Sequence, residues 1–214
     1  MSEDVSTRIA KLWHRVVAGL GSAGKSLRLR PGRTDLQPIE DRLGLRLPDD
    51  YRAWLALHDG EDNAPGRVEY LPGGGFLLPA DVTLQRWVDN QEWFQGDDDV
   101  GPAPFQDDDR IRNVVAHARR VMIASNRYGD GDNTFLDFCP GPAGTAGQVI
   151  VATSECDFEV VGASFEDFLR RLATALEDGL LEVRPARGRE GPRVGARGHE
   201  HGRWESALRE VTPR

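Results

Sequence analysis

Four short runs of β-branched and aromatic residues follow one another in the second half of this sequence, and they constrain the fold more than any other feature. Gly, Asp and Asn separate the runs, and these residues favour chain reversals. Strands joined by such short turns pair in the antiparallel direction. The sequence therefore predicts an antiparallel meander made of residues 121–125, 134–138, 148–152 and 158–161.

An amphipathic helix is predicted to follow this meander. Ser164 and Asp167 have the spacing of a helix start that resembles a capping box, and Gly179 is a suitable end. The apolar residues between them recur every three or four positions, as Phe165, Phe168, Leu169, Leu172 and Leu176. We expect this helix to cover one face of the sheet, so the predicted fold class is α+β, with a mostly antiparallel sheet and helices packed around it.

The first half of the chain reads mainly as helix. An amphipathic helix is expected up to residues 19–21, and a second, capped by Thr34 or Asp35, is expected to end at Gly44. Pro48 suits the start of a third helix, which closes near residue 60. A hairpin or two edge strands at residues 68–71 and 76–78, and a helix capped by Asp81, complete the prediction.

Length and charge suggest one main domain with extensions. We predict three parts in the 214 residues: an N-terminal helix and linker at 1–26, a domain at 27–183, and a flexible Arg/Gly-rich tail at 184–214. Eight Arg against four Glu give the tail a charge of +4, so the total of -8 leaves -12 on the rest. An acidic body disfavours nucleic acid as a partner. No signal peptide or membrane helix is recognised, so we expect a cytoplasmic protein.

Several short motifs suggest chemistry that their context does not support. GLGSAGKS at residues 19–26 fits the phosphate-loop pattern, but a predicted helix precedes it where that loop needs a strand. Asp130, Asp132 and Asn133 lack the continuation of a calcium loop and favour a tight turn. The histidines and the two cysteines form no metal or redox motif. We therefore expect no cofactor, no metal, no small-molecule substrate and no enzymatic activity.

Acidic residues are concentrated between positions 89 and 109, which hold eight acidic residues and no basic one. Such a loop is usually only solvated, but it can also steer a basic protein towards its binding surface. The candidate partner-binding residues are Asp97, Asp98, Asp99, Asp107, Asp108 and Asp109.

The sequence resembles the SUKH superfamily, and within it the Smi and Knr family of cell-wall-assembly regulators. The most specific parts of the resemblance are residues 40–52, the pair Asp59 and Gly60, and residues 147–150. It departs from the pattern at Arg119 and Arg120, where many relatives carry Trp before the strand, so this position is expected to pack differently. The matching motif residues are expected to serve the architecture: Glu40, Leu43, Gly44, Leu47, Pro48 and Trp54.

The resemblance implies a protein that acts by binding another protein. Bacterial members of the superfamily are mostly immunity proteins, so the first hypothesis is an immunity protein that neutralises a basic toxin, such as a nuclease. The alternative is an intracellular regulatory scaffold of the cell-wall synthesis type. A third hypothesis is a nucleotide-binding protein that uses residues 19–26.

Overall fold

The fold is described from a computed structural model of the chain. The structure describes residues 3–71, 75–91, 99–102, 107–126, 128, 132–153, 157–185, 191–198, 207–208 and 211. None of the helices in these ranges is long and apolar enough to cross a membrane.

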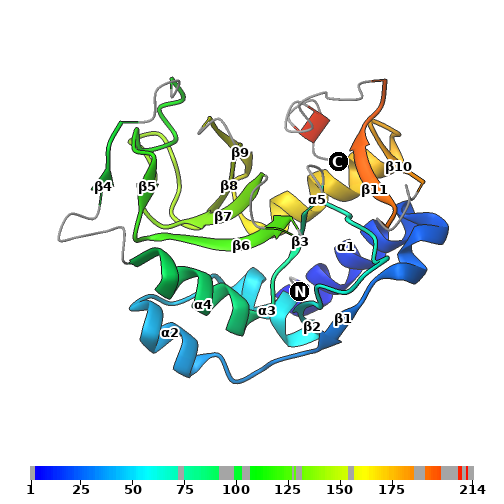
Figure 1. The fold of residues 1–214 in the computed structure, drawn as a ribbon, viewed down its shortest axis with the longest axis horizontal. Helices are drawn as coiled ribbons and strands as arrows, with labels where there is room; N and C mark the ends of the chain where they lie inside the picture. The colour runs from blue at the N-terminus through cyan, green and yellow to red at the C-terminus, as the bar shows by residue number, and fades with distance from the viewer. Residues whose placement is uncertain are drawn as a thin grey trace.

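The predicted meander is present as the central sheet, which confirms the α+β class. Its strand order is β3-β6-β7-β8-β9, and every neighbouring pair is antiparallel (Figure 1). Most residues of these strands are buried, because both faces of the sheet carry β-branched and apolar side chains. The bounds are Gly75–Leu77 for β3, Arg120–Asn126 for β6, Asn133–Asp137 for β7, Gln148–Ala152 for β8 and Phe158–Gly162 for β9.

Helix α5, Phe165–Glu177, follows β9 and packs against β8 and β9. Ser164 is its N-cap, and its hydroxyl accepts a hydrogen bond of 3.2 Å from the Asp167 backbone N–H. Phe165, Phe168, Leu169 and Leu172 are completely buried, as their spacing predicts. We call the sheet face towards this helix the inner face.

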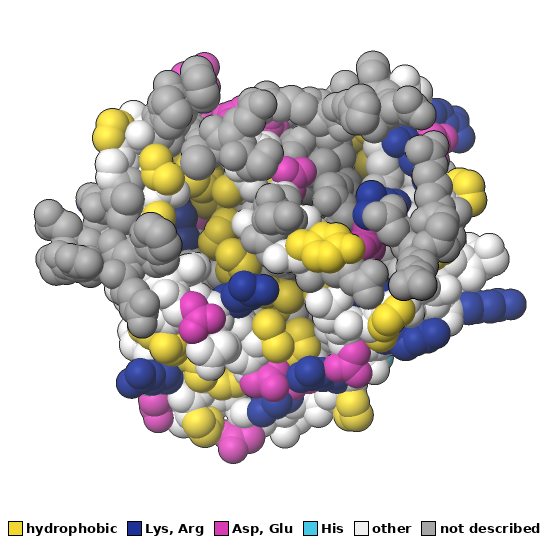
Figure 2. Space-filling model, in the orientation of Figure 1, with side chains coloured by type: hydrophobic (Ala, Val, Ile, Leu, Met, Phe, Trp, Pro, Cys, Tyr) yellow, Lys and Arg dark blue, Asp and Glu magenta, His cyan; other side chains and the backbone are white. Residues whose placement is uncertain are grey.

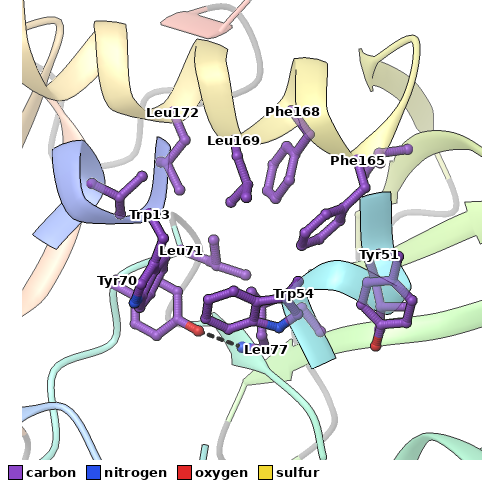
Figure 3. Close-up of a cluster of buried hydrophobic side chains, with 14 of the residues drawn as sticks. Trp13, Tyr51, Trp54, Tyr70, Leu71, Leu77, Phe165, Phe168, Leu169 and Leu172 are labelled. Atoms are coloured by element: carbon purple, nitrogen blue, oxygen red, sulfur yellow. Dashed lines mark hydrogen bonds between the residues drawn. The ribbon is translucent and has the colours of Figure 1, made fainter. Parts of the chain in front are cut away.

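Helices α1, Val5–Gly19, and α3, Asp49–Leu57, pack beside α5 and close the core on the inner face. The indole of Trp54 lies at their junction and is fully buried. Its ring centroid is 4.4 Å from that of Trp13 in an edge-on contact, and Trp13 lies 5.4 Å from Tyr70 (Figure 3). The Tyr70 hydroxyl accepts a hydrogen bond of 3.0 Å from the Leu77 N–H, which ties this cluster to β3.

The segment between residues 27 and 61 differs in detail from the prediction. Helix α2, Gln37–Leu43, has Leu36 as its N-cap and no side-chain cap, so Thr34 and Asp35 do not fill that role. The third helix ends at Leu57, and β2, His58–Glu61, pairs with β1, Leu29–Pro31. Gly60 has a φ of 68°, and a Cβ there would lie 2.2 Å from the Pro79 nitrogen. A close backbone approach therefore requires this glycine.

The remaining short elements surround the sheet. Helix α4, Ala80–Gln91, is capped at its N-terminus by Asp59, whose Oδ1 accepts a hydrogen bond from the Ala80 N–H at 2.8 Å. The predicted cap by Asp81 is therefore wrong. Strand β4, Asp99–Val100, pairs with β5, Ala116–His117, outside the central sheet. A 3-10 helix, η1, spans Gly21–Ser26 after α1.

The described parts of residues 184–214 contain regular structure where the sequence predicts a flexible tail. Strand β10, Leu181–Arg184, pairs with β11, Arg193–Ala196. The backbone of Glu69 also accepts from the Val194 N–H at 2.9 Å, and Leu208 is fully buried. This segment is too poor in apolar residues to fold alone, but it can pair with strands that are already in place. The domain boundaries at 26 and 183 remain a prediction.

We predict that Trp13→Ala lowers the free energy of unfolding by about 3 to 5 kcal/mol, because it leaves a cavity between α1 and Trp54. The matched control is His14→Ala, since His14 is the next residue on the same helix and is exposed. It should change stability by less than about 0.5 kcal/mol. Urea unfolding followed by tryptophan fluorescence and circular dichroism measures both, and equal losses would contradict the role of Trp13.

A second stability effect comes from Glu61 at the end of β2. Its side chain is fully buried, and its Oε1 accepts a hydrogen bond of 2.9 Å from the Arg28 N–H. Burial raises the pKa of this carboxyl from 4.5 to about 7. The folded protein therefore binds more protons than the unfolded chain between these two values, so stability falls as the pH rises from about 4.5 to 7.

We predict that Glu61→Gln removes this pH dependence. The variant should exceed the wild type in stability at pH 8, by up to about 3 kcal/mol, and approach it near pH 5. Urea unfolding at several pH values measures the difference, with Glu182→Gln as the control. A difference that stays constant between pH 5 and pH 8 would contradict the assignment.

Candidate protein-binding surface

A hollow of about 400 Å³ lies beside Asp107, Asp108 and Asp109, which we call the acidic triplet. The triplet forms one side of the hollow, and Ile111, Arg112 and Asn113 continue it. The other side consists of Pro140, Gly141 and Pro142, from the loop between β7 and β8. The structure thus places half of the predicted binding residues against a groove with both apolar and charged walls.

Backbone hydrogen bonds fix the acidic triplet to the β7–β8 loop. The Ala143 N–H donates to the Asp109 carbonyl at 3.1 Å, and the Gly141 N–H donates to the Arg110 carbonyl at 2.9 Å. The contact is close enough to require glycine, because a Cβ on Gly141 would lie 2.4 Å from the Asp109 oxygen. The described part of this acidic loop is thus exposed at Asp107 and Asp109 and has a defined backbone.

The three carboxylates of the triplet have different environments. Asp108 is half-buried and binds its neighbour Arg110, whose backbone N–H and Nε donate to Asp108 Oδ1 at 3.0 and 2.9 Å. This hydrogen bonding raises the pKa of Arg110 further above its ordinary value. Asp107 and Asp109 are exposed. Because Asp108 is compensated locally, the outward charge of the triplet comes from Asp107 and Asp109.

Arg120, Asp137 and Gln148 form a buried polar cluster beneath this surface. They stand opposite one another on β6, β7 and β8, and none is more than 6% exposed. Gln148 Nε2 donates to Asp137 Oδ2 at 3.0 Å and to the Arg110 carbonyl at 2.9 Å. Arg120 Nε lies 3.8 Å from Asp137 Oδ1. The cluster therefore joins three strands to the segment that carries the triplet.

Arg120 also reaches the segment that follows the triplet. Its guanidinium donates to the carbonyls of Arg112 at 2.7 Å and Val114 at 2.8 Å. It lies 4.6 Å above the ring of Phe158, which provides a cation–π contact. These contacts explain how an Arg side chain is accommodated at a buried position at the start of β6. Composition cannot reveal this role, because an Arg before a strand is normally exposed.

The other predicted binding residues are only partly described. Asp97 and Asp98 lie outside the described residues, and Asp99 is placed only as the first residue of β4. β4 pairs with β5, and the Val115 N–H donates to the Gly101 carbonyl at 3.0 Å. Asp99 and the segment after the triplet therefore belong to neighbouring backbone, but no contact between Asp99 and the triplet is established.

The motif residues have structural roles. Glu40 Oε1 accepts from the Leu47 N–H at 2.8 Å, and its Oε2 pairs with Arg52. Asp50 Oδ2 accepts from the Glu166 N–H at 2.8 Å, at the start of α5. These contacts hold α2, α3 and α5 together. The motif at residues 40–52 thus serves the fold.

The nucleotide hypothesis for residues 19–26 is not supported by their conformation. Gly19 ends α1, and η1 occupies Gly21–Ser26, so no strand enters this segment and no α-helix leaves it. Lys25 is exposed.

Burial raises the pKa of the Cys139 thiol to about 12, which makes it a poor nucleophile. Within the described ranges, no three His, Cys, Asp or Glu side chains are grouped to hold a metal ion.

Comparison with known proteins finds a family and two fungal relatives. The sequence matches the SMI1 / KNR4 family (SUKH-1) over residues 32–171. It is 31% identical over 156 residues to the cell wall biosynthesis/cell cycle regulator smi1 of Schizosaccharomyces pombe, a match that covers 68% of this chain and 31% of the relative. It is 27% identical over 185 residues to a glucan synthesis regulatory protein of Neurospora crassa, covering 68% and 33%. The matches thus span about a third of each curated relative.

We predict that Arg120→Met destabilises the protein by about 3 to 5 kcal/mol, because it leaves the Asp137 carboxylate buried without its cation. It should also speed hydrogen exchange at the Ile111 amide, whose segment loses two hydrogen bonds from Arg120. Urea unfolding and hydrogen exchange measured by NMR check these effects.

The control is Arg119→Met at the exposed neighbouring position. Adding Asp137→Asn to Arg120→Met should recover part of the lost stability. If Arg120→Met and Arg119→Met behave alike, the buried polar cluster does not support the triplet.

Proposed function

Because the chain belongs to the SMI1 / KNR4 family (SUKH-1), we propose that it is a non-enzymatic regulatory protein of the cell-wall synthesis type, which acts in the cytoplasm by binding another protein. Its two fungal relatives are named as regulators of cell wall biosynthesis and of glucan synthesis. Neither is named for a toxin. The comparisons therefore favour regulation over toxin neutralisation, which is the first hypothesis from the sequence.

The observation that carries the binding proposal is the fixed position of the acidic triplet. Asp107 and Asp109 are exposed on a backbone that is hydrogen-bonded to the β7–β8 loop and supported by buried Gln148. Carboxylates that are already in place lose little conformational entropy when a partner binds. Together with the charge of -12 on residues 1–183, they favour a basic protein surface as the partner.

An immunity protein is the second candidate. The eight acidic residues between positions 89 and 109 would suit a basic toxin domain such as a nuclease. The two candidates share the binding surface and differ in the partner, so a test in the native host separates them.

We predict that deletion of the gene in the native host reduces incorporation of a labelled cell-wall precursor. Wild-type protein should restore incorporation. A variant with Asn at all six candidate positions should not restore incorporation, because it lacks the charge that attracts the partner. These positions are Asp97, Asp98, Asp99, Asp107, Asp108 and Asp109.

A matched control carries six Asp→Asn changes at exposed positions elsewhere: Asp4, Asp35, Asp41, Asp49, Asp62 and Asp178. It should restore incorporation as well as the wild type. If both six-fold variants fail equally, net charge and not this surface is responsible. If deletion leaves wall synthesis unchanged but the deletion strain is killed in co-culture with its parent, the protein is an immunity protein.

A further inference from the structure

An apolar row crosses the outer face of the central sheet, on the side away from α5. Met122 stands opposite Phe135, Phe135 opposite Ile150, and Ile150 opposite Val160. Residues directly opposite in adjacent strands share one face of a sheet. The alternate residues on the same strands, such as Ile123, Leu136 and Val149, belong to the main core on the inner face. Phe135, Ile150 and Val160 therefore belong to the outer face, apart from that core, whereas Met122, at the β6 end of the row, also packs against the main core.

Only half of this row is covered. Ile111, just after the acidic triplet, packs with Ile150, Phe158 and Val160 in a second apolar cluster, where all four side chains are buried. At the β6–β7 end, Met122 and Phe135 stay half-exposed, as do Val115 and Ala152 nearby. We call these four residues the open end of the row. Figure 2 shows hydrophobic side chains gathered in a hollow over the region where Figure 1 draws β5 to β8.

The charges near the open end are mainly acidic. Among the described residues around it, Asp107 and Asp109 are exposed, and Asp132 and Asp157 are half-buried just before β7 and β9. Arg110 is also exposed but pairs with Asp108, whereas Arg112 and Arg119 are exposed and oppose these carboxylates in part. Four carboxylates against two guanidinium groups leave a negative rim. The buried polar cluster lies in the next row of the same face and is bonded to the segment that follows Asp107 and Asp109.

We propose that the open end of the row is the docking surface for a protein segment that carries an apolar side chain between Arg or Lys residues. The inference rests on the proposed function and names the chemistry of the partner. The apolar side chain contacts Met122 and Phe135, since methionine adapts its shape and aromatic side chains provide large contact area. The flanking cations meet the carboxylates of Asp107 and Asp109. A second copy of this chain fits less well, because two negative rims repel each other.

The sequence provides a probe at this position. The chain has two methionines, Met1 and Met122, so methyl labelling with ¹³C gives one reporter at the proposed contact and one at the N-terminus. The titrant is a short synthetic peptide that alternates Arg with Leu and Phe. One control peptide replaces Leu and Phe with Ser, and another replaces Arg with Glu.

We predict that the alternating peptide shifts the Met122 methyl signal to saturation and leaves the Met1 signal in place. Both control peptides should bind at least about tenfold more weakly, since each lacks one of the two contacts. Asp107→Asn with Asp109→Asn should weaken the alternating peptide by about tenfold. Asp35→Asn with Asp41→Asn, an equal change of charge on α2 and just before it, should not.

Three results would overturn the proposal. The first is a Met122 signal that the alternating peptide does not move, and the second is equal affinity for all three peptides. The third is a Met122 shift that appears when protein concentration alone is raised, which would assign the surface to a second copy of the chain. The regulatory proposal is tested independently, because incorporation of the wall precursor in the deletion strain is measured without the peptide.

Discussion

The packing of Trp54 between α1 and α5 is the contact on which the rest of the structure depends. Its indole is fully buried, with ring centroids 4.4 Å from Trp13 and 6.4 Å from Phe165. Aromatic side chains of this size contribute much of the apolar area of a core. One side chain thus connects three helices, and α1, which precedes the family match at residues 32–171, completes a core whose other helices begin within it. The inner face is closed by this arrangement, so any partner must use another surface.

Buried or half-buried carboxylates supply a second set of contacts beside the aromatic core. Several of them accept a hydrogen bond from the backbone N–H of another residue: Glu40 from Leu47, Asp50 from Glu166, Asp59 from Ala80, Glu61 from Arg28, Asp137 from Cys139 and Asp167 from Ala163. A carboxylate in this role is directed inward and contributes little to the field that a partner meets. The net charge of the chain therefore does not locate a binding surface by itself. The exposed Asp107 and Asp109, whose backbone is fixed, are the carboxylates that we propose for binding.

The sequence allowed prediction of those elements whose pattern is local. Helix α5 follows from the spacing of Phe165, Phe168 and Leu172, and the central strands follow from short apolar runs between turn residues. Contacts between distant residues were missed. The Asp59 cap of α4 joins residues 21 positions apart in the sequence. Likewise, β2 forms because Glu61 pairs with Leu29, which lies on a distant segment. The buried role of Arg120 was hidden for the same reason, since its carboxylate and its carbonyl partners lie on other segments.

The two faces of the central sheet explain why the acidic triplet and the apolar row belong to one surface. On the inner face, helices cover the strands completely, and this cover is held by large apolar contacts. On the outer face, a loop covers β8 and β9 through Ile111 and leaves Met122 and Phe135 half-exposed. That loop is fixed by polar bonds from Arg120 and Gln148, which are directional and set its position closely. The same bonds therefore determine both where the carboxylates stand and how much of the apolar row stays open, so a change in the buried polar cluster alters charge and shape together.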